Sequence, residues 1–167
     1  MPAAQHDLAA AARHSLPALI PPRRWLGLYW PLGHEPNLLS LAEPPPSGGG
    51  PRLALPVVEH QQLLYRAWNP QVALGPDACG IPAPQGTSPL PAGDLGLLLV
   101  PALALDRRGI RLGSGGGWYD RLRADKAWRA VPALAVLPAA CLTLELPRDS
   151  WDVPFDGWLD EQGIHWL

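Results

Sequence analysis

The chain has 167 residues, a formal net charge of −2 and a sequence pI near 6.2. A chain of this length is typical of one domain with a single core. The charge excludes the basic surplus with which nucleic-acid-binding proteins follow phosphates, so no nucleic acid partner is expected. Its 13 cationic residues are twelve arginines and Lys126, so arginine must supply the positive charge for any anionic ligand.

The sequence shows neither a secretion or membrane-spanning signal nor a cysteine spacing typical of a zinc site. The amino-terminal residues lack a charged segment followed by an uninterrupted apolar core, and no stretch approaches ~20 apolar residues. We therefore expect a cytoplasmic monomer without a membrane partner. Cys79 and Cys141 lie far apart and share no metal-binding spacing, which favours two small buried side chains over a zinc site or a disulfide.

The first part of the chain predicts a helix, a strand and a linker. The alanine-rich residues Gln5–Leu16 are typical of a short helix that ends before Pro17. The apolar and aromatic run Trp25–Trp30 predicts a buried strand, and Glu35 lies just beyond its end. Consecutive prolines and glycines exclude a regular element in Glu43–Gly50, which is therefore expected to be a surface linker.

Two strands and a long loop follow the linker. The residues Arg52–Val58 predict a strand that is broken at Pro56. The run Gln62–Trp68 predicts a second strand, whose side chains alternate between its two faces. Proline and glycine are frequent in Asn69–Gly93, so this segment is expected to be a loop.

The run Asp94–Leu105 is the most continuously hydrophobic stretch of the chain. In α/β proteins such runs are strands buried on both faces of a parallel sheet, so we expect the central strand here. A turn follows in which Arg107 and Arg108 are expected to face solvent. The spacing of apolar residues then predicts one helix over Trp118–Ala130 and a short strand over Pro132–Pro138.

The tail, Leu146–Leu167, is expected to mix turns with one or two short extended pieces. Trp151, Trp158 and Trp166 in this tail are interpreted as packing residues. Together these elements predict one α/β domain over residues 1–167, with a central, mostly parallel sheet flanked by helices.

The segment RLGSGGGWYDR, Arg111–Arg121, places four glycines between the predicted central strand and the predicted helix. Strand, glycine loop and helix in this order can form an anion site at the carboxyl edge of a sheet. The loop lacks both the Gly-Lys-Ser/Thr of a P-loop and the spacing of a dinucleotide fingerprint. Its flanking arginines, and Asp120 as a ligand for Mg²⁺ carried with phosphates, favour a nucleotide site over a simple turn.

The longer segment VPALALDRRGIRLGSGGGWYDR resembles the signature of the 5-formyltetrahydrofolate cyclo-ligases, also called methenyltetrahydrofolate synthetases. The usual form of that signature is a strand followed by P-G-x-A-F-D-x-x-G-x-R-L-G-x-G-G-G-Y-Y-D-R. The segments YWPLGHE, LALPVV, LLYRAW, CGIPAPQG and LPRDSWDVPFD also fall in the order and spacing of this family. The resemblance therefore covers most of the chain.

The resemblance implies a ligase that uses ATP and Mg²⁺ to close 5-formyltetrahydrofolate to 5,10-methenyltetrahydrofolate, with release of ADP and phosphate. Such an enzyme mainly positions two ligands and neutralises charge. The glycines would bring backbone N–H groups close to the triphosphate with no Cβ in the way. The aromatic residues after them would form a wall for the flat folate.

The resemblance also implies roles for individual residues. ATP would be bound by Arg111, Leu112, Gly113, Ser114, Gly115, Gly116, Gly117, Trp118 and Tyr119. The folate would be bound by Trp30, Glu35, Ser114, Gly115, Gly116, Gly117 and Trp118, because a carboxylate such as that of Glu35 accepts two hydrogen bonds from ring N–H groups. Asp120 and Asp152 would ligate Mg²⁺. Tyr119 and Arg121 would act in catalysis, with Arg121 balancing phosphate charge.

Several of these residues have simpler interpretations. Trp30 can be a core residue of a buried strand. Asp152 and Asp156 can cap local turns, and Glu35 can be an exposed loop acid.

The chain also departs from the family pattern. Family members usually begin with a longer helical segment whose Lys and Arg reach the ATP phosphates, whereas the first predicted helix here offers Arg13. Trp118 replaces the usual first tyrosine, and Cys141 stands where Gln is frequent. A start codon placed too far downstream or weaker phosphate binding would account for the first departure. The alternative function is therefore a folate-binding protein with weakened catalysis.

Overall fold

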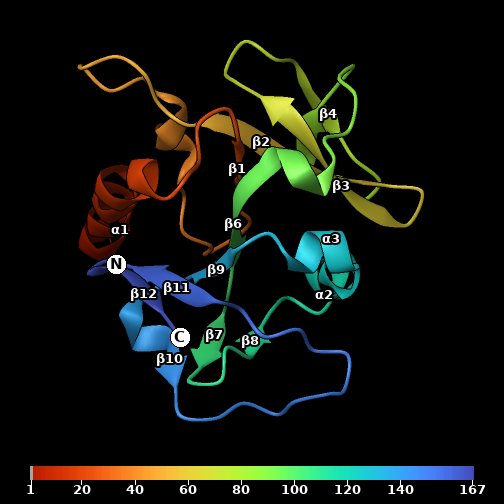
Figure 1. Cartoon of the computed structure of the whole chain (residues 1–167). Coiled ribbons are helices and arrows are strands. Elements are labelled where there is room, and N and C mark those ends of the chain that lie inside the picture. Colours follow the sequence, from red (N-terminus) through yellow and green to blue (C-terminus); the bar gives the residue numbers. More distant parts are fainter. Residues whose placement is uncertain (1) are drawn as a thin grey trace.

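The structure is a computed structural model that describes residues 2–167 and, for Pro2, the backbone alone. A seven-stranded sheet crosses the molecule (Figure 1). In spatial order its strands are β12 (Gly163–Trp166), β11 (Gly157–Asp160), β9 (Ala133–Val136), β6 (Leu95–Pro101), β1 (Trp25–Gly27), β2 (Arg52–Glu59) and β3 (Gln62–Trp68). The four inner pairs are parallel, and antiparallel hairpins close both edges. The predicted mostly parallel α/β sheet is confirmed.

The hydrophobic run predicted as the central strand does lie in the middle of the sheet. It divides, however: β6 ends at Pro101, and β7 (Ala104–Asp106) joins a separate small sheet. That sheet has the order β10-β7-β8, with β8 at Arg111–Leu112 and β10 at Leu142–Thr143. The chain therefore leaves the main sheet at Pro101 and returns toward it through β8.

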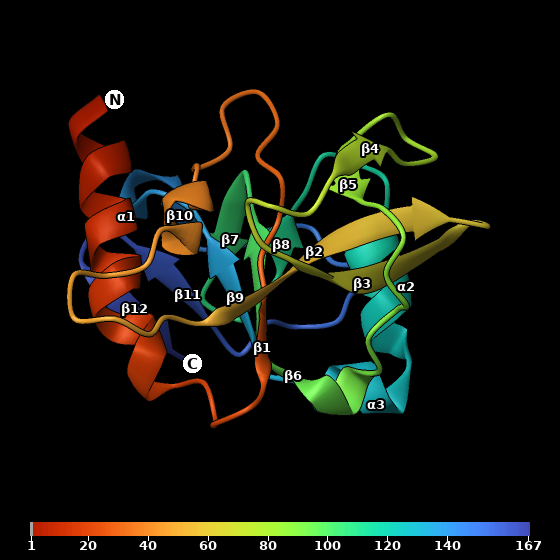
Figure 2. The same ribbon diagram turned by 90° about the horizontal axis from the view of Figure 1, so that it is seen from above.

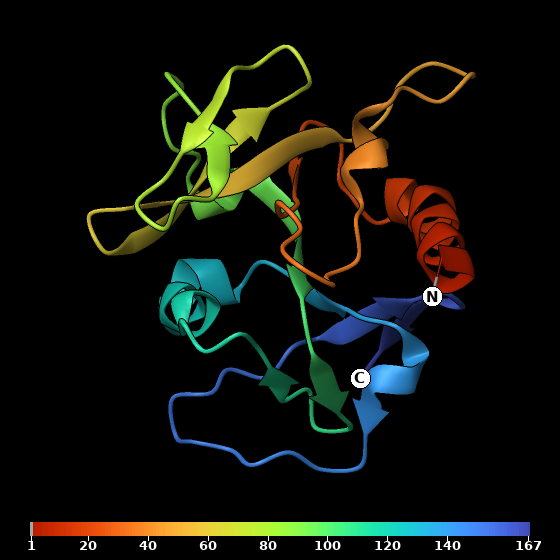
Figure 3. The same ribbon diagram turned by 180° about the vertical axis from the view of Figure 1, so that it is seen from behind.

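Helices cover both faces of the main sheet, as predicted (Figures 2 and 3). On one face α1 (Pro2–Ser15) packs Leu8 and Ala12 against Leu97 and Leu99 of β6. On the other face the core contains Leu98 and Val100, which alternate with them along β6, and α2 and α3 pack against it. Burial of each leucine side chain contributes roughly 1.5–3 kcal/mol, so both layers stabilise β6.

The predicted helix Trp118–Ala130 is two helices, α2 (Trp118–Ala124) and α3 (Lys126–Arg129). The break lies at Asp125, whose backbone is extended. Its carboxylate accepts hydrogen bonds from the N–H groups of Ala127 at 2.8 Å and Trp128 at 3.3 Å. An aspartate that caps a new helix competes with continuation of the old one, and this capping was missed in the sequence.

The predicted break of a strand at Pro56 is wrong, because β2 runs through it and pairs with β3. The hairpin turns at His60 and Gln61, both with positive φ, so Glu59 and Gln62 form the hydrogen-bonded pair. By alternation, Pro56 occupies a position that does not bond to β3. Its missing N–H points toward β1, which has already ended at Gly27, so no ladder bond is lost.

Other segments also differ from the predictions. The predicted loop Asn69–Gly93 contains a small hairpin of β4 (Leu74–Pro76) and β5 (Pro82–Pro84). The strand predicted over Trp25–Trp30 ends at Gly27. Cys79 is exposed, so the prediction that it is buried is wrong, and Cys141 is half-buried. The remaining short helices are 3-10 turns at Leu16–Ala18, Leu39–Ala42, Ala92–Asp94 and Ala139–Cys141. Within residues 2–167 no helix is long and apolar enough to span a bilayer.

The turn after β7 is organised by the buried carboxylate of Asp106 rather than by solvated arginines. Asp106 accepts hydrogen bonds from the backbone N–H groups of Arg108, Ile110 and Leu146. Arg107 and Arg108 are both exposed, as predicted, and the Arg108 guanidinium also lies 2.8 Å from Asp106 Oδ2 and 3.3 Å from Glu145 Oε1. Burial raises the pKa of Asp106, but these hydrogen bonds outweigh it and lower the pKa to about 2.

We predict that Asp106→Asn lowers the free energy of unfolding at pH 7 by about 1–2 kcal/mol, a figure reduced for the exposure of Arg108. A depressed folded-state pKa gives stability that is present above the unfolded value, about 3.9, and is lost as pH falls toward about 2. The difference in free energy of unfolding between Asp106→Asn and the unsubstituted protein should therefore shrink as the pH falls from 4 to about 2. Urea unfolding over this range checks it, with exposed Asp94→Asn as the control; a constant difference would contradict it.

Candidate active site

A narrow crevice of about 110 Å³ opens at the carboxyl ends of β1 and β6. Its walls are residues that follow β1, the inner side of the β2–β3 hairpin, the turn between β4 and β5, and the glycine loop. The predicted ligand-binding residues that line it are Trp30, Glu35, Arg111, Ser114, Gly115, Gly116, Gly117, Trp118 and Tyr119. Leu112 and Gly113 do not line it, and the Leu112 side chain is exposed.

Two glycines of the loop let arginine side chains fold over them. A Cβ at Gly113 would lie 2.6 Å from Arg111 Nη1 and 2.7 Å from Nη2. A Cβ at Gly117 would lie 2.9 Å from Arg121 Nη1, and the backbone there has a φ of +66°. Such contacts are far shorter than van der Waals distances, so the loop lets two arginines lie directly on the backbone.

Arg111 is the electrostatic centre of the crevice. Its Nη1 donates to Pro101 O at 2.8 Å, and its Cζ lies 5.4 Å from the centre of the Tyr119 ring. Burial lowers the pKa of Arg111, while Tyr119, Asp120, Glu35 and Asp152 oppose this through their charges. The guanidinium therefore interacts electrostatically both with Glu35, the predicted folate-binding residue, and with the predicted metal ligands Asp120 and Asp152.

Glu35 is half-buried, not an exposed loop acid. Its Oε2 accepts a hydrogen bond from the N–H of Leu32 at 2.9 Å. Burial raises the pKa of Glu35, and the Leu32 N–H and the charge of Arg111 offset part of the rise. Trp30 is also half-buried: it packs against the core on the α1 face and lines the crevice, so both interpretations of this residue hold.

The hydroxyl of Tyr119 faces a second phenol, Tyr65, under the glycine loop. Burial raises the pKa of Tyr119; the charge of Arg111 lowers it and that of Glu35 raises it. Burial likewise raises the pKa of Tyr65 well above its usual value. The two hydroxyls influence each other, yet Tyr65 Oη makes no hydrogen bond of good geometry within the described residues. Tyr119 is therefore protonated at neutral pH and can donate a hydrogen bond.

The predicted metal ligands and Arg121 lie outside the crevice, in an adjacent depression of about 260 Å³. Asp120 Oδ1 is 3.5 Å from Val153 N, and Asp152 Oδ2 accepts from Asp149 N at 2.7 Å, so the turn-capping interpretation of Asp152 also holds. No group of three or more candidate metal-ligating residues occurs among residues 2–167. Two carboxylates fit Mg²⁺, which typically takes one or two carboxylates and completes its shell with phosphate oxygens and water.

Arg123 is a buried residue of this site that the sequence analysis missed. Its side chain is 2% exposed, and it holds the segment after Asp152 against α2. Nη1 donates to Pro154 O at 3.1 Å, Nη2 lies 3.5 Å from Asp156 Oδ2, and Cζ lies 4.7 Å from the Phe155 ring centre. Asp156 in turn accepts from Ala133 N at the start of β9. No local motif marked Arg123, because its partners are about 30 residues away.

The tail tryptophans do not share one role. Trp158 is half-buried and stacks on His165 with ring centres 4.8 Å apart, which confirms a packing role. Trp151 is 67% exposed and Trp166 is 50% exposed, so the packing interpretation is wrong for these two. Trp151 lines the depression together with Asp120 and Asp152.

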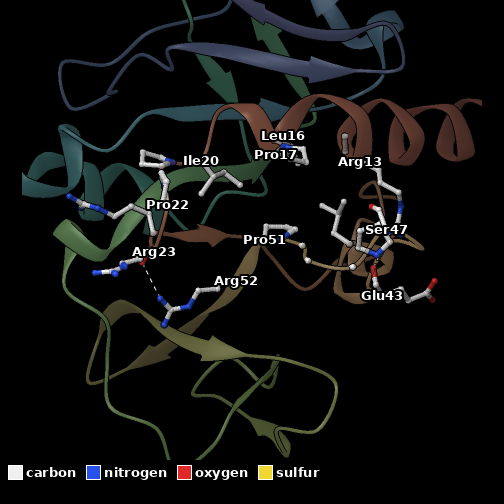
Figure 4. Close-up of a pocket in the computed structure, with 18 residues that line it drawn as sticks. Arg13, Leu16, Pro17, Ile20, Pro22, Arg23, Glu43, Ser47, Pro51 and Arg52 are labelled. Carbon is white, nitrogen blue, oxygen red and sulfur yellow. Dashed lines mark hydrogen bonds between the residues drawn. The ribbon is translucent and has the colours of Figure 1, made fainter.

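A wider hollow of about 480 Å³ lies at the opposite, amino edge of the sheet, where β1 and β2 begin (Figure 4). Two of the four arginines that line it are engaged by the backbone: Arg13 donates to Ser40 O and Glu43 O, and Arg52 Nη1 donates to Arg23 O at 3.0 Å. None of the predicted site residues lines this hollow. We therefore place the active site at the crevice, although the crevice is smaller.

The sequence profile of the 5-formyltetrahydrofolate cyclo-ligase family matches residues 26–160, which include every element of the crevice. The chain belongs to the 5-formyltetrahydrofolate cyclo-ligase family. The matched range begins at Leu26 in β1 and ends at Asp160 in β11, so α1 and β12 lie outside it. The family resemblance of the sequence is thus confirmed.

Curated relatives and solved structures agree with the family assignment. A 5-formyltetrahydrofolate cyclo-ligase from Haemophilus influenzae is 35% identical over 103 residues, covering 59% of this chain and 54% of the relative. One from Escherichia coli is 32% identical and is covered over 60% of its length, so this chain spans little more than half of these two relatives. One from Mycolicibacterium smegmatis is 32% identical over 87% of this chain and 77% of its own.

The solved structure of 5,10-methenyltetrahydrofolate synthetase from Aquifex aeolicus has the same fold. It superimposes with a TM-score of 0.73 at 27% sequence identity, covering 98% of this chain and 80% of that one. The cyclo-ligase-like α/β fold predicted from the sequence is therefore confirmed.

We predict that Gly113→Ala displaces the Arg111 guanidinium from Pro101 O without unfolding the protein. The added Cβ meets the far end of a flexible side chain, which can move, and the φ of Gly113 needs no glycine. Loss of one charged hydrogen bond to a phosphate costs about 1.5–3 kcal/mol, so affinity for inorganic tripolyphosphate should fall roughly tenfold or more. Calorimetric titration measures it; Gly93→Ala, which meets no atom within 4 Å, is the control. Unchanged affinity would contradict the prediction.

Proposed function

We propose that this protein closes 5-formyltetrahydrofolate to 5,10-methenyltetrahydrofolate with MgATP, releasing ADP and phosphate. The observation that carries the proposal is the position of the glycine loop, which separates two hollows of different chemistry. On one side lie Glu35 and Trp30 in the crevice, and on the other lie Asp120 and Asp152 in the depression. A phosphate chain along the loop would meet a folate on one side and a metal on the other.

The crevice side has groups that suit a pterin. Both oxygens of the Glu35 carboxylate can accept hydrogen bonds from the ring N–H and amino groups of the substrate. Trp30 and Trp118 border the same space and offer flat apolar surfaces to a flat ring. The narrowness of the crevice would exclude water from the reacting formyl group.

The loop side has groups that suit a triphosphate. Arg111 and Arg121 both lie on the glycine backbone, where charged hydrogen bonds to phosphate oxygens are strong. Asp120 and Asp152 would hold Mg²⁺, which would supply positive charge to the phosphate oxygens during transfer. Tyr119, protonated and next to Arg111, would donate a hydrogen bond at the junction of the two ligands.

The reaction then needs two substitutions at groups held in the crevice. The formyl oxygen forms a bond to the γ-phosphorus, and the bond from that phosphorus to the β,γ-bridging oxygen breaks and releases ADP. The N10 amine next attacks the activated formyl carbon, and its proton leaves with the departing inorganic phosphate, so that the methenyl bridge remains. Neither step requires a protein nucleophile, so positioning and charge neutralisation are the contributions of the chain.

A direct assay tests the proposal. Purified protein mixed with 5-formyltetrahydrofolate and MgATP should produce the absorbance of the methenyl product, with one ADP formed per product. Omission of ATP or of Mg²⁺ should abolish the signal. Absence of product at high protein concentration would count against catalysis.

We predict that Asp120→Asn reduces turnover while folate binding survives. Asparagine keeps the size of the side chain but removes the charge that a hard divalent cation requires. Glu35 and Trp30 lie on the other side of the loop, so the loss in turnover should exceed the loss in folate affinity by at least ~2 kcal/mol. Near wild-type turnover at saturating Mg²⁺ and ATP would refute the metal assignment. Asp125→Asn, at the cap of α3, is a control for loss of one helix-terminal carboxylate.

A folate-binding protein with weakened catalysis is the second candidate function. It is favoured by the position of Arg13, the cation of α1, which is bonded to Ser40 O and Glu43 O beside the hollow at the opposite edge of the sheet. That residue therefore adds no charge to the phosphate loop. Binding of 5-formyltetrahydrofolate without product formation in the assay above would support this alternative.

A further inference from the structure

The indole of Trp151 is an exposed aromatic surface that neither the crevice nor the core uses. It lies in the long connection between β10 and β11, directly before Asp152, and is 67% exposed. A large aromatic side chain left in water beside charged groups is a recurrent mark of a binding surface. Trp166 is also exposed, but it lines a different hollow at the end of β12.

Trp151 borders the same depression as Arg121, Asp152 and Gly117. Gly117 also lines the crevice, so the glycine loop is a common wall of the two spaces. A triphosphate that lies along this loop has one end at the crevice, where the formyl group reacts. Its other end, which carries the nucleoside, is then directed into the depression and toward Trp151.

The charges around the depression favour a nucleobase there and the pterin in the crevice. Arg121 is held against Trp118, with its Cζ 4.4 Å from the ring centre. Arg129 donates from Nε to Arg123 O at 3.2 Å, which fixes a second guanidinium at the rim of the depression. Bases stack on indoles and on arginine planes, whereas a pterin gains most from the half-buried Glu35 carboxylate in the crevice.

We propose that Trp151 is the stacking platform for the base of the nucleoside triphosphate. The inference deepens the proposed function and rests on its assignment of ATP to the glycine loop. Trp151 and Asp152 directly precede Val153 and Pro154, whose carbonyl oxygens accept hydrogen bonds from Arg123 of α2, so the segment that carries both residues is anchored to α2. One short segment would therefore carry both the platform for the base, Trp151, and a ligand for the metal, Asp152.

Binding measurements without folate test this platform. In the presence of Mg²⁺, Kd is measured by calorimetry for ATP and for inorganic tripolyphosphate, which has the phosphates but no base. Trp151→Ala should raise the Kd for ATP about tenfold, the scale of one lost stacking contact, and leave the Kd for tripolyphosphate within twofold. Trp151→Phe should restore most of the ATP affinity, and Trp166→Ala should change neither Kd.

Three outcomes overturn the inference, and a fourth bears on the proposed function alone. An ATP affinity that stays within twofold in Trp151→Ala shows that the indole does not hold the base. Equal losses for ATP and tripolyphosphate show that the residue acts on the phosphates or on the metal segment. Failure of the unsubstituted protein to bind ATP overturns both this inference and the proposed function. Binding of ATP without cyclisation of the folate overturns the catalytic proposal alone and leaves the platform supported.

Discussion

The partial removal of one guanidinium, that of the half-buried Arg111, from water sets the conditions for the rest of the site. A cation removed from water is costly unless it is hydrogen-bonded and faces opposite charge. Here it has one carbonyl, Pro101 O at 2.8 Å, and the faces of two aromatic rings. Since these partners are neutral, the charge is balanced only by carboxylates on either side of it and by whatever anion enters. The site is thus organised around a positive charge that is incompletely compensated by the protein.

The small sheet explains how Arg111 comes to lie at the end of the central strand. After Pro101 the chain makes an excursion through β7, turns at Asp106 and returns as β8, with Leu105 paired to Arg111. Leu103 N donates to Leu112 O at 2.8 Å, which closes the excursion. The carboxylate of Asp106 fixes the turn through the N–H groups of Arg108 and Ile110 and joins it to the tail through the N–H of Leu146, and Arg111 follows this turn directly. A structural acid far from both ligands therefore positions a binding residue.

Local sequence patterns predicted the parts of this arrangement that depend on neighbours in the chain. The uninterrupted apolar run predicted the central strand, and the glycine loop with its flanking residues predicted one wall of the crevice, because these residues are contiguous. The capping of α3 by Asp125 and the passage of β2 through Pro56 were not predictable in this way. In both cases the outcome depends on which hydrogen bond a residue makes or does not need, and that is decided by the neighbouring element.

The positions of Arg123 and Trp151 also depend on contacts that local sequence patterns do not predict. Arg123 is buried because the tail segment folds over it, and Trp151 is exposed because that segment is held by Arg123, Asp156 and Phe155 instead of by the indole. The sequence analysis interpreted Trp151 as a packing residue and assigned no role to Arg123. Long-range contacts decide the position of both residues.

The charges around the glycine loop bear on how the ligands would enter. Asp120 and Asp152 border the depression beside the loop, and two carboxylates repel a triphosphate unless a cation lies between them. Residues 2–167 contain no group of three acidic, histidine or cysteine side chains that would hold such a cation alone. Mg²⁺ usually completes its shell with phosphate oxygens and water, so metal and nucleotide would bind as a unit, each supplying what the other lacks. The crevice is lined by two carboxylates. Asp77 already accepts hydrogen bonds from backbone N–H groups, and Glu35, whose pKa is raised by burial, needs donors rather than a cation. The depression therefore suits a cation bound with phosphate, whereas the crevice suits a ligand that donates hydrogen bonds. The half-buried guanidinium of Arg111 is the group that both ligands would share.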